Sequence, residues 1–269
     1  MQYDPIKRGL GSFFNRSPKL RILFYKLLDL LLLRAWHIKR ELRKFHRQNP
    51  GEMQILDAGS GFGQYTHFLS RLSRTSTIKG VDVKEEQVED CNRFFKAIDK
   101  ETRVRFELAD LTKFREEDKY QLVLCVDVME HIEEDVLVFK NLVASMKTGG
   151  MLLISTPSDQ GGSDVHEHED ESFIEEHVRD GYNIREIEEK LVTAGFSRVD
   201  ARYAYGWPGK ISWRLSMKYP ITMLNTSKIF YVLLPFYYII TFPFSLLLNT
   251  LDVHLKYDTG TGLIVKAFK

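Results

Sequence analysis

Three glycines stand at every second position in the stretch ILDAGSGFGQYT, between a short apolar run and a run with helical spacing. They are Gly59, Gly61 and Gly63, and Asp57 comes just before them. Glycines let ligand atoms approach the backbone, and a helix that begins beside them offers unpaired N–H groups. The spacing is neither the G-x-G-x-x-G of dinucleotide sites nor the G-x-x-x-x-G-K-[ST] of phosphate loops. The stretch predicts a loop that binds another nucleotide-like ligand.

Alternating strands and helices surround this glycine-rich stretch. Apolar runs with strand character alternate with helices of roughly ten to fifteen residues, which is typical of an α/β fold with a mostly parallel sheet covered on both faces. The predicted strands are 53–59, 77–83, 104–110, 120–128, 149–156 and 197–205, and the predicted helices between them are 64–72, 85–98, 133–146 and 184–195.

Four further stretches follow the glycines in a set order: KGVDVKEEQ, FELADLTKF, LVLCVDVMEHIEED and TGGMLLISTP. Together with the glycines they resemble the motifs of class I S-adenosylmethionine-dependent methyltransferases, in the branch that acts on small molecules and lipids. The resemblance covers residues 50–204 and a last strand near 261–268. It implies a Rossmann-like sheet of seven strands, the last antiparallel, and S-adenosylmethionine as the cofactor.

The resemblance also assigns roles within these stretches. Asp82 would hold both ribose hydroxyls, which suits a carboxylate because it can accept two hydrogen bonds at once. Asp110 would contact the adenine amino group, and residues 127–131 would lie beside the methionine end. The implied cofactor-binding residues are Asp57, Gly59, Ser60, Gly61, Gly63, Asp82, Val83, Asp110, Leu111, Asp127 and Val128. Tight packing is the alternative role for the glycines, and Gln64, Tyr65 and His67 fit packing as well as ligand contact.

Methyl transfer depends mainly on holding the acceptor in line with the methyl group. We expect an oxygen acceptor, which also needs a base to remove its proton. The candidate bases are His131, His166 and His177. His131 could instead order the nearby loop, and the histidines and acids of 164–182 could form a solvated lid; a metal site there is conceivable, but we expect none.

Several features argue against a nucleic-acid substrate. Residues 127–130 lack the N/D-P-P-Y/F stretch of nucleobase amine methyltransferases, and neither cysteine stands beside a proline, as in carbon-5 pyrimidine enzymes. Residues 50–204 are acidic, with 19 Lys or Arg against 32 Asp or Glu, which suits phosphate contacts poorly. Two cysteines form no disulfide framework, as expected in the cytoplasm.

Residues 229–251 contain no charged side chain. At ~1.5 Å per residue such a helix could cross a hydrocarbon layer of ~30 Å. However, the last strand must return to the sheet that holds the strand before it, so a single crossing would separate them. We therefore predict a re-entrant or in-plane helical hairpin in one leaflet, with the run broken by Pro235 and Pro243. Interfacial side chains precede it: Trp207, Lys210, Trp213, Arg214, Lys218 and Lys228.

The N-terminal 49 residues are basic, with 12 Lys or Arg against 3 Asp or Glu. Apolar residues at helical spacing over 20–45 predict one or two amphipathic helices that end at Asn49-Pro50-Gly51. These helices could lie on an anionic membrane surface or, as in many members of the resembled family, cover the cofactor. Asp29 interrupts the apolar part, so we do not expect a signal peptide.

The sequence thus divides into basic helices (1–49), a cofactor-binding core (50–206), an apolar membrane-associating insertion (207–253) and final strands (254–269). We expect a methyltransferase that acts at the membrane surface on a lipid-like or hydrophobic small molecule. It would be cytoplasmic, peripheral or monotopic at the inner face, on an anionic leaflet. The alternatives are a soluble acceptor with the insertion as a homodimer interface, and a cofactor-binding or scaffold protein without activity.

Overall fold

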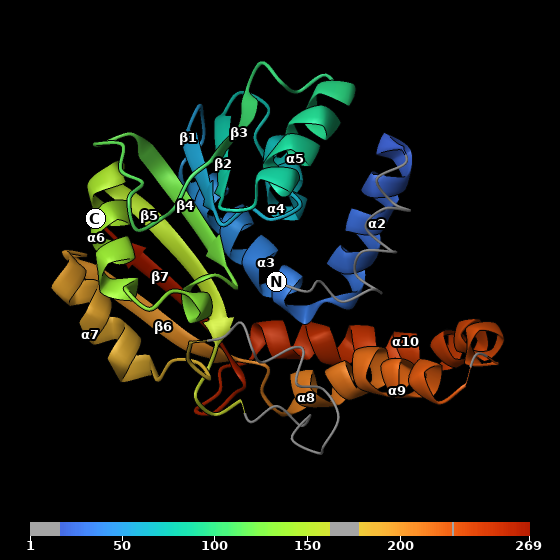
Figure 1. The fold of residues 1–269 in the computed structure, drawn as a ribbon. Helices are drawn as coiled ribbons and strands as arrows, with labels where there is room; N and C mark the ends of the chain where they lie inside the picture. The colour runs from blue at the N-terminus through green and yellow to red at the C-terminus, as the bar shows by residue number, and fades with distance from the viewer. Residues whose placement is uncertain (1–16, 162–177, 228) are drawn as a thin grey trace.

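The computed structural model describes residues 17–161, 178–227 and 229–269 (Figure 1). Its centre is a seven-stranded sheet with the order β3-β2-β1-β4-β5-β7-β6. The strands are β1 (Gln54–Ala58), β2 (Thr77–Asp82), β3 (Val104–Leu108), β4 (Tyr120–Val126), β5 (Met146–Pro157), β6 (Arg198–Ala204) and β7 (Gly262–Phe268).

The direction of the strands confirms the predicted fold class. Strand β1 is parallel to β2 and β4, and β4 is parallel to β5. Strand β7 runs antiparallel between β5 and β6. The carboxyl ends of the parallel strands therefore meet at one edge, where ligands of open α/β sheets bind.

Helices cover both faces of the sheet because β1 and β4 are apolar on both sides. One face is covered by α3 (Leu33–Gln48), α4 (Gln64–Leu72) and α5 (Glu85–Ala97), whose core includes Leu42, Leu69 and Phe95. The other is covered by α6 (Asp135–Ser145) and α7 (Ile184–Ala194), through Phe139 and Leu191 among others.

Two N-terminal helices pack on the first face. Helix α2 (Pro18–Leu31) begins after Ser17, whose hydroxyl accepts from the Leu20 N–H at 3.2 Å. A break at Leu32 separates it from α3, which ends before Asn49 as predicted. Helix α3 is buried along one side, including Ile38 and Leu42, so it is a core element, whereas α2 leaves several leucines exposed.

A helical hairpin connects β6 to β7, and we call residues 207–254 the apolar hairpin. Its first arm consists of α8 (Trp207–Trp213), the π-helix η2 (Arg214–Lys218) and α9 (Tyr219–Thr226). Its second arm is the single helix α10 (Phe230–His254). Figure 1 shows the two arms side by side, projecting from the sheet below α2. The predicted return of the chain to the sheet is therefore confirmed.

Two details of the prediction were wrong. Pro235 and Pro243 do not break the apolar run, because α10 continues through both. Each proline removes one backbone hydrogen bond, and both lie on the exposed side of the helix, where their rings meet little packing. Residues 254–269, expected to form final strands, contribute β7 alone, because α10 extends to His254.

Candidate active site

The glycine loop, residues 59–63, joins β1 to α4 at the carboxyl edge of the sheet. Gly59, Gly61 and Gly63 have φ of +76°, +51° and +79°, a region that side chains other than glycine rarely occupy. A Cβ on Gly59 would lie 2.2 Å from Cγ2 of Val128. Both backbone conformation and space therefore require glycine here, and the loop lies directly against the segment that follows β4.

Asp82 ends β2 and faces the glycine loop. Its carboxylate accepts from the Gly61 N–H at 2.8 Å and from the Lys84 N–H at 3.0 Å. An ionised carboxylate has about four acceptor positions, so these bonds leave capacity for two hydroxyl donors. The next residue, Val83, is exposed and could cover a flat ligand.

Asp110 lies beyond the end of β3, one strand further along the same edge. Its Oδ1 accepts from the Thr112 N–H at 2.9 Å and the Thr112 hydroxyl at 2.7 Å, and these bonds lower the pKa of the carboxyl. The neighbouring Leu111 is buried in the core. Asp110 is exposed, and its lowered pKa keeps the carboxylate ionised, so it can accept a hydrogen bond from an amino group.

Asp127 lies at the end of β4, on the other side of the glycine loop. Its φ is +50°, and its N–H donates to the Ser155 carbonyl of β5 at 2.8 Å. Its carboxylate forms an ion pair with Arg34 of α3. The sheet order therefore places Asp110, Asp82 and Asp127 in sequence along one edge, the order in which the predicted adenine, ribose and methionine contacts would follow one another.

Arg34 was missed by sequence reasoning. Its own N–H donates to the Tyr205 hydroxyl at 2.9 Å, which ties the first turn of α3 to the end of β6. The basic composition of the N-terminal helices was the only signal in the sequence, and it does not single out one arginine.

A buried hydroxyl of the glycine loop fits a bound cofactor. The Ser60 hydroxyl is buried without a hydrogen-bond partner in the described part of the chain, and the buried Tyr65 hydroxyl lies beside Arg34. Burial raises the pKa of Tyr65 to about 12, so its hydroxyl stays protonated. A polar group of S-adenosylmethionine could supply the partner that Ser60 lacks, because buried polar groups are normally satisfied.

Gln64 and His67 have packing roles. The Gln64 amide donates to Asp29 of α2 at 2.7 Å. The His67 ring lies among aromatic side chains, 5.2 Å from Tyr25 and 6.1 Å from Phe94, and burial lowers its pKa to about 4. Both residues attach α4 to its surroundings.

Asp57 lies under the loop, fully buried in β1. Its carboxylate accepts from the Thr66 hydroxyl of α4. Burial raises the pKa of Asp57 to about 6, the bond from Thr66 lowers it, and the charge of Asp82 raises it further. The structure thus places Asp57 as a support of the loop from inside.

The raised pKa of Asp57 predicts a pH-dependent stability. The folded chain binds this proton more tightly than the unfolded chain, whose carboxyl has a pKa of about 4. The stabilising contribution is therefore present below pH ~4 and is lost as the pH rises through about 6. We expect Asp57→Asn to gain up to about 3 kcal/mol of unfolding free energy relative to the wild type between pH 4 and 7. Urea unfolding at several pH values measures this difference; parallel pH profiles would contradict it.

The candidate bases are only partly described. His131 belongs to the short helix η1 (Met129–His131) at the end of β4 and is exposed. His166 and His177 lie outside the described residues. Beside His131, the buried Glu130 carboxylate accepts from the Thr156 hydroxyl at 3.0 Å. This bond connects η1 to β5. The described residues contain no group of three His, Cys, Asp or Glu that could hold a metal.

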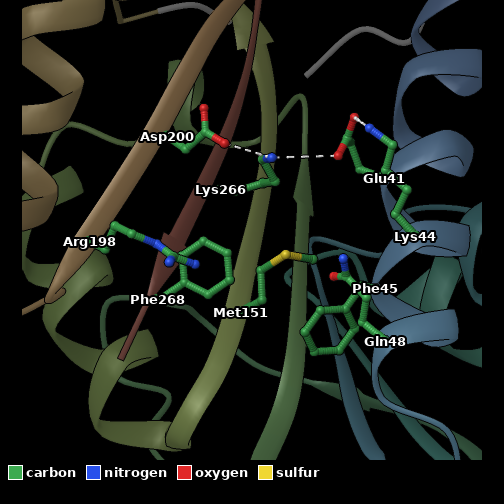
Figure 2. Close-up of a pocket in the computed structure, with 9 residues that line it drawn as sticks. All are labelled: Glu41, Lys44, Phe45, Gln48, Met151, Arg198, Asp200, Lys266 and Phe268. Atoms are coloured by element: carbon green, nitrogen blue, oxygen red, sulfur yellow. Dashed lines mark hydrogen bonds and ion pairs between the residues drawn. The ribbon is translucent and has the colours of Figure 1, made fainter.

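A groove elsewhere in the molecule does not belong to this site. It lies between α3 and strands β5, β7 and β6, and Figure 2 shows its lining. Met151 pairs with both Leu122 and Phe268 there, near the start of β4, so the groove lies toward the amino ends of the parallel strands. Lys266 is paired with Asp200 at 2.7 Å and with the buried Glu41 at 3.6 Å. None of the predicted cofactor-binding residues lines the groove.

A family model described as a methyltransferase domain matches residues 50–195. The chain belongs to this methyltransferase family. The resemblance to class I S-adenosylmethionine-dependent methyltransferases is therefore confirmed, together with the expected cofactor. Curated relatives include a ubiquinone biosynthesis O-methyltransferase of Rickettsia felis, 25% identical over 41% of this chain and 44% of the relative. Another is the (S)-coclaurine N-methyltransferase of Papaver somniferum, 26% identical over 55% of this chain and 39% of the relative.

The chain spans only about a third to a half of the length of the curated relatives that it matches first. Solved structures support the fold. Phosphoethanolamine N-methyltransferase 2 of Haemonchus contortus, in complex with S-adenosyl-L-methionine, has a TM-score of 0.57 at 18% identity, over 91% of this chain and 60% of that chain. A putative sarcosine dimethylglycine methyltransferase from Galdieria sulphuraria has a TM-score of 0.54 at 15% identity, over 86% and 82% of the two chains.

Proposed function

We propose that this methyltransferase transfers the methyl group of S-adenosylmethionine to an oxygen of a lipid-like or hydrophobic acceptor at a membrane surface. Membership of the family indicates the reaction, methyl transfer. The exposed, apolar helix α10 is the observation that supports a hydrophobic acceptor. By length and composition α10 could cross a membrane, yet only 6% of its most apolar 18-residue window is buried. An exposed apolar surface of this kind is typical of a site that contacts a membrane or another protein.

The interior of the apolar hairpin supports a lipid environment. Small and polar side chains lie between its arms, where Ser212, Ser216, Ser245 and Asn249 are buried. The Ser212 hydroxyl donates to the Ser245 carbonyl at 3.2 Å, and two tyrosines of α10 donate to carbonyls of η2 at 2.8 Å. Polar residues inside and apolar residues outside reverse the usual pattern of a water-exposed helix pair. Helices that pack within lipid have this arrangement.

The outer side of α10 is an apolar row, defined here as Phe236, Ile239, Ile240, Phe244 and Leu247. Ile239 and Ile240 are 71% and 69% exposed, and no charged side chain belongs to the row. Lys210 and Arg214 of the first arm are exposed. With α10 in the acyl region, these cations would lie near the headgroups, which favours an anionic leaflet.

The base of the hairpin lies next to the methionine end of the cofactor site. The buried Asp252 at the end of α10 bonds to the His37 ring at 2.8 Å and accepts from the Gly209 N–H at 3.0 Å. His37 lies one turn from Arg34, which reaches Asp127. A hydrophobic molecule at the base of the hairpin would therefore be closer to the predicted methionine end at Asp127 than to the predicted adenine end at Asp110.

The reaction assigns distinct tasks to the described residues. Bound S-adenosylmethionine supplies a methyl group on a positively charged sulfur, so little covalent help is needed. The glycine loop and Asp82 orient the cofactor, and the hairpin presents the acceptor in line with it. His131 is the described histidine at the end of β4 that can take the proton of an acceptor hydroxyl.

Burial of both free cysteines is compatible with the reducing cytoplasm, and we place the protein at the inner face of the membrane.

The formation of S-adenosylhomocysteine from separated cell fractions tests this proposal. Purified protein with S-adenosylmethionine should form the product with the membrane fraction of a host extract and only at background with the soluble fraction. Product from the soluble fraction alone would favour the soluble acceptor, with the apolar row as a homodimer interface that light scattering would reveal. No product from either fraction, despite calorimetric cofactor binding, would favour the inactive scaffold.

A further inference from the structure

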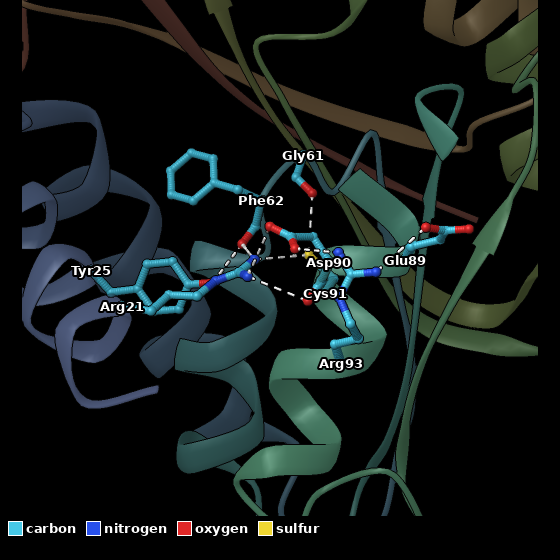
Figure 3. A network of polar contacts seen from close by, with 8 residues as sticks. All are labelled: Arg21, Tyr25, Gly61, Phe62, Glu89, Asp90, Cys91 and Arg93. Carbon is cyan, nitrogen blue, oxygen red and sulfur yellow. Dashed lines mark hydrogen bonds and ion pairs between the residues drawn. The ribbon is translucent and has the colours of Figure 1, made fainter. Parts of the chain in front are cut away.

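Helix α2 contacts the glycine loop from outside the sheet, through two buried side chains. Arg21 and Tyr25 are 3% and 1% exposed, although they belong to a surface helix. Figure 3 shows both side chains pointing toward the backbone of Phe62, the residue between Gly61 and Gly63. The contact joins segments about forty residues apart in sequence.

The Phe62 carbonyl receives two donors from α2. The Arg21 Nη2 donates to it at 2.7 Å, and the Tyr25 hydroxyl donates to it as well. The Arg21 Nε donates to the Tyr25 oxygen at 2.7 Å, so the two side chains hold each other in place. Hydrogen bonds from a charged donor are among the stronger ones in proteins.

Helix α5 holds the other side of Arg21. The Arg21 Nη1 lies 3.3 Å from the Asp90 carbonyl and 3.5 Å from its carboxylate, and the guanidinium stacks 4.7 Å from the centre of the Phe94 ring. The Cys91 thiol donates to the Gly61 carbonyl at 3.5 Å. The guanidinium is thus fixed from three sides, and its position determines that of the Phe62 carbonyl.

The Phe62 carbonyl belongs to the peptide group that also carries the Gly63 N–H. This N–H donates to the Ser60 carbonyl at 3.0 Å, which closes the loop. Two residues before Gly63, the Gly61 N–H donates to the Asp82 carboxylate. Because a peptide group is planar, fixing its carbonyl fixes the direction of its N–H. The two donors of α2 therefore control the orientation of the loop that faces the cofactor.

We propose that Arg21 and Tyr25 are positioning residues for cofactor binding: they hold the glycine loop, through the Phe62 carbonyl, in the conformation that binds S-adenosylmethionine. Neither residue contacts the face of the loop that lies toward the ligand. Their role goes beyond the proposed acceptor and membrane site, and it holds whichever acceptor is methylated.

Calorimetric titration with S-adenosylhomocysteine tests the proposal without an acceptor. We expect Tyr25→Phe, which removes one hydroxyl, to raise the Kd by ~3- to 10-fold, and Arg21→Gln by at least ~10-fold. Arg21→Lys keeps a charged donor and should recover part of the affinity. Hydrogen exchange in the peptide covering 59–63 should become faster in the two weakened variants, because the loop loses its anchor.

Arg93→Gln is the matched control. Arg93 lies in the same cluster and bonds to Asp90 at 2.6 Å, but it is exposed and does not contact the loop. Its Kd should stay within twofold of the wild type. If Arg21→Gln and Tyr25→Phe lower only the melting temperature and leave the Kd and the exchange of 59–63 unchanged, the residues are merely structural and the proposal is wrong. Because no acceptor is used, this result is independent of the proposed function.

Discussion

Replacement of Asp82 by alanine is expected to weaken the binding of S-adenosylhomocysteine at least ~100-fold. The variant loses a carboxylate that can accept from two ribose hydroxyls, and each hydrogen bond to a charged group contributes ~1.5–3 kcal/mol. It also removes the acceptor of the Gly61 N–H at 2.8 Å, which loosens the glycine loop. Isothermal titration calorimetry measures the effect, and the melting temperature of the free protein shows whether the fold is kept.

Two variants make this result specific. Asp82→Asn keeps one oxygen acceptor and should bind with intermediate affinity. Asp118→Ala removes an acid that is exposed beside β4 and is paired only with Lys269 in the described contacts, so it should bind as the wild type does. Equal affinity of Asp82→Ala and Asp118→Ala would mean that the ribose does not lie at Asp82.

Serine substitutions in the apolar row are expected to abolish membrane binding and leave the cofactor site intact. Burial of one large apolar side chain contributes ~1.5–3 kcal/mol, so the triple variant Phe236→Ser, Ile240→Ser and Leu247→Ser should lower the partition coefficient at least ~100-fold. Cosedimentation with vesicles of phosphatidylglycerol and phosphatidylcholine measures this change. The Kd for S-adenosylhomocysteine should stay within twofold of the wild type.

A control variant separates the hairpin from general surface hydrophobicity. Leu108, Leu137 and Val192 are exposed apolar residues on other parts of the molecule. Their replacement by serine should leave vesicle binding unchanged. A wild-type protein that stays in the supernatant, and whose dimer dissociates in the apolar-row variant, would assign α10 to a subunit interface instead.

The sheet could be predicted from sequence because its signals are local. Buried parallel strands such as LVLCV are short apolar runs, and the glycine loop has a spacing that its backbone conformation requires. The return of the last strand to the sheet followed from topology and is confirmed, whereas the hairpin was expected within 229–251 and in fact pairs this run with residues 207–226.

The first arm of the hairpin was not predicted, because its polar and charged residues leave no continuous apolar run in the sequence. Lys210 and Arg214 interrupt the apolar residues, and the side that packs on α10 consists of small residues such as Ser212. Seen alone, this segment resembles a polar flank. The structure of α10 is needed to see that the side of the first arm with small residues is the side that packs. A contact between helices that lie tens of residues apart leaves no periodic pattern in the sequence.

The candidate cofactor site likewise contains residues that the sequence motifs could place and residues that only the structure shows. Asp82 ends β2 and Asp110 follows β3, so the motifs could place both, whereas Arg34 and Arg21 contact Asp127 and the glycine loop from helices that precede them in the chain. Their contacts join residues 93 and 41 positions apart, Arg34 to Asp127 and Arg21 to Phe62. A basic amphipathic helix looks the same in sequence whether its arginines face water or a buried carbonyl.

The most direct test of a lipid-directed methyltransferase follows the transferred group itself. Purified protein would be incubated with methyl-labelled S-adenosylmethionine and a total extract of the host, with Asp82→Ala in parallel, and then partitioned between organic solvent and water. We predict label in the organic phase that is lost with Asp82→Ala, and a product that mass spectrometry can identify. Label confined to the aqueous phase would contradict the lipid-like acceptor and leave the apolar hairpin without a role in catalysis.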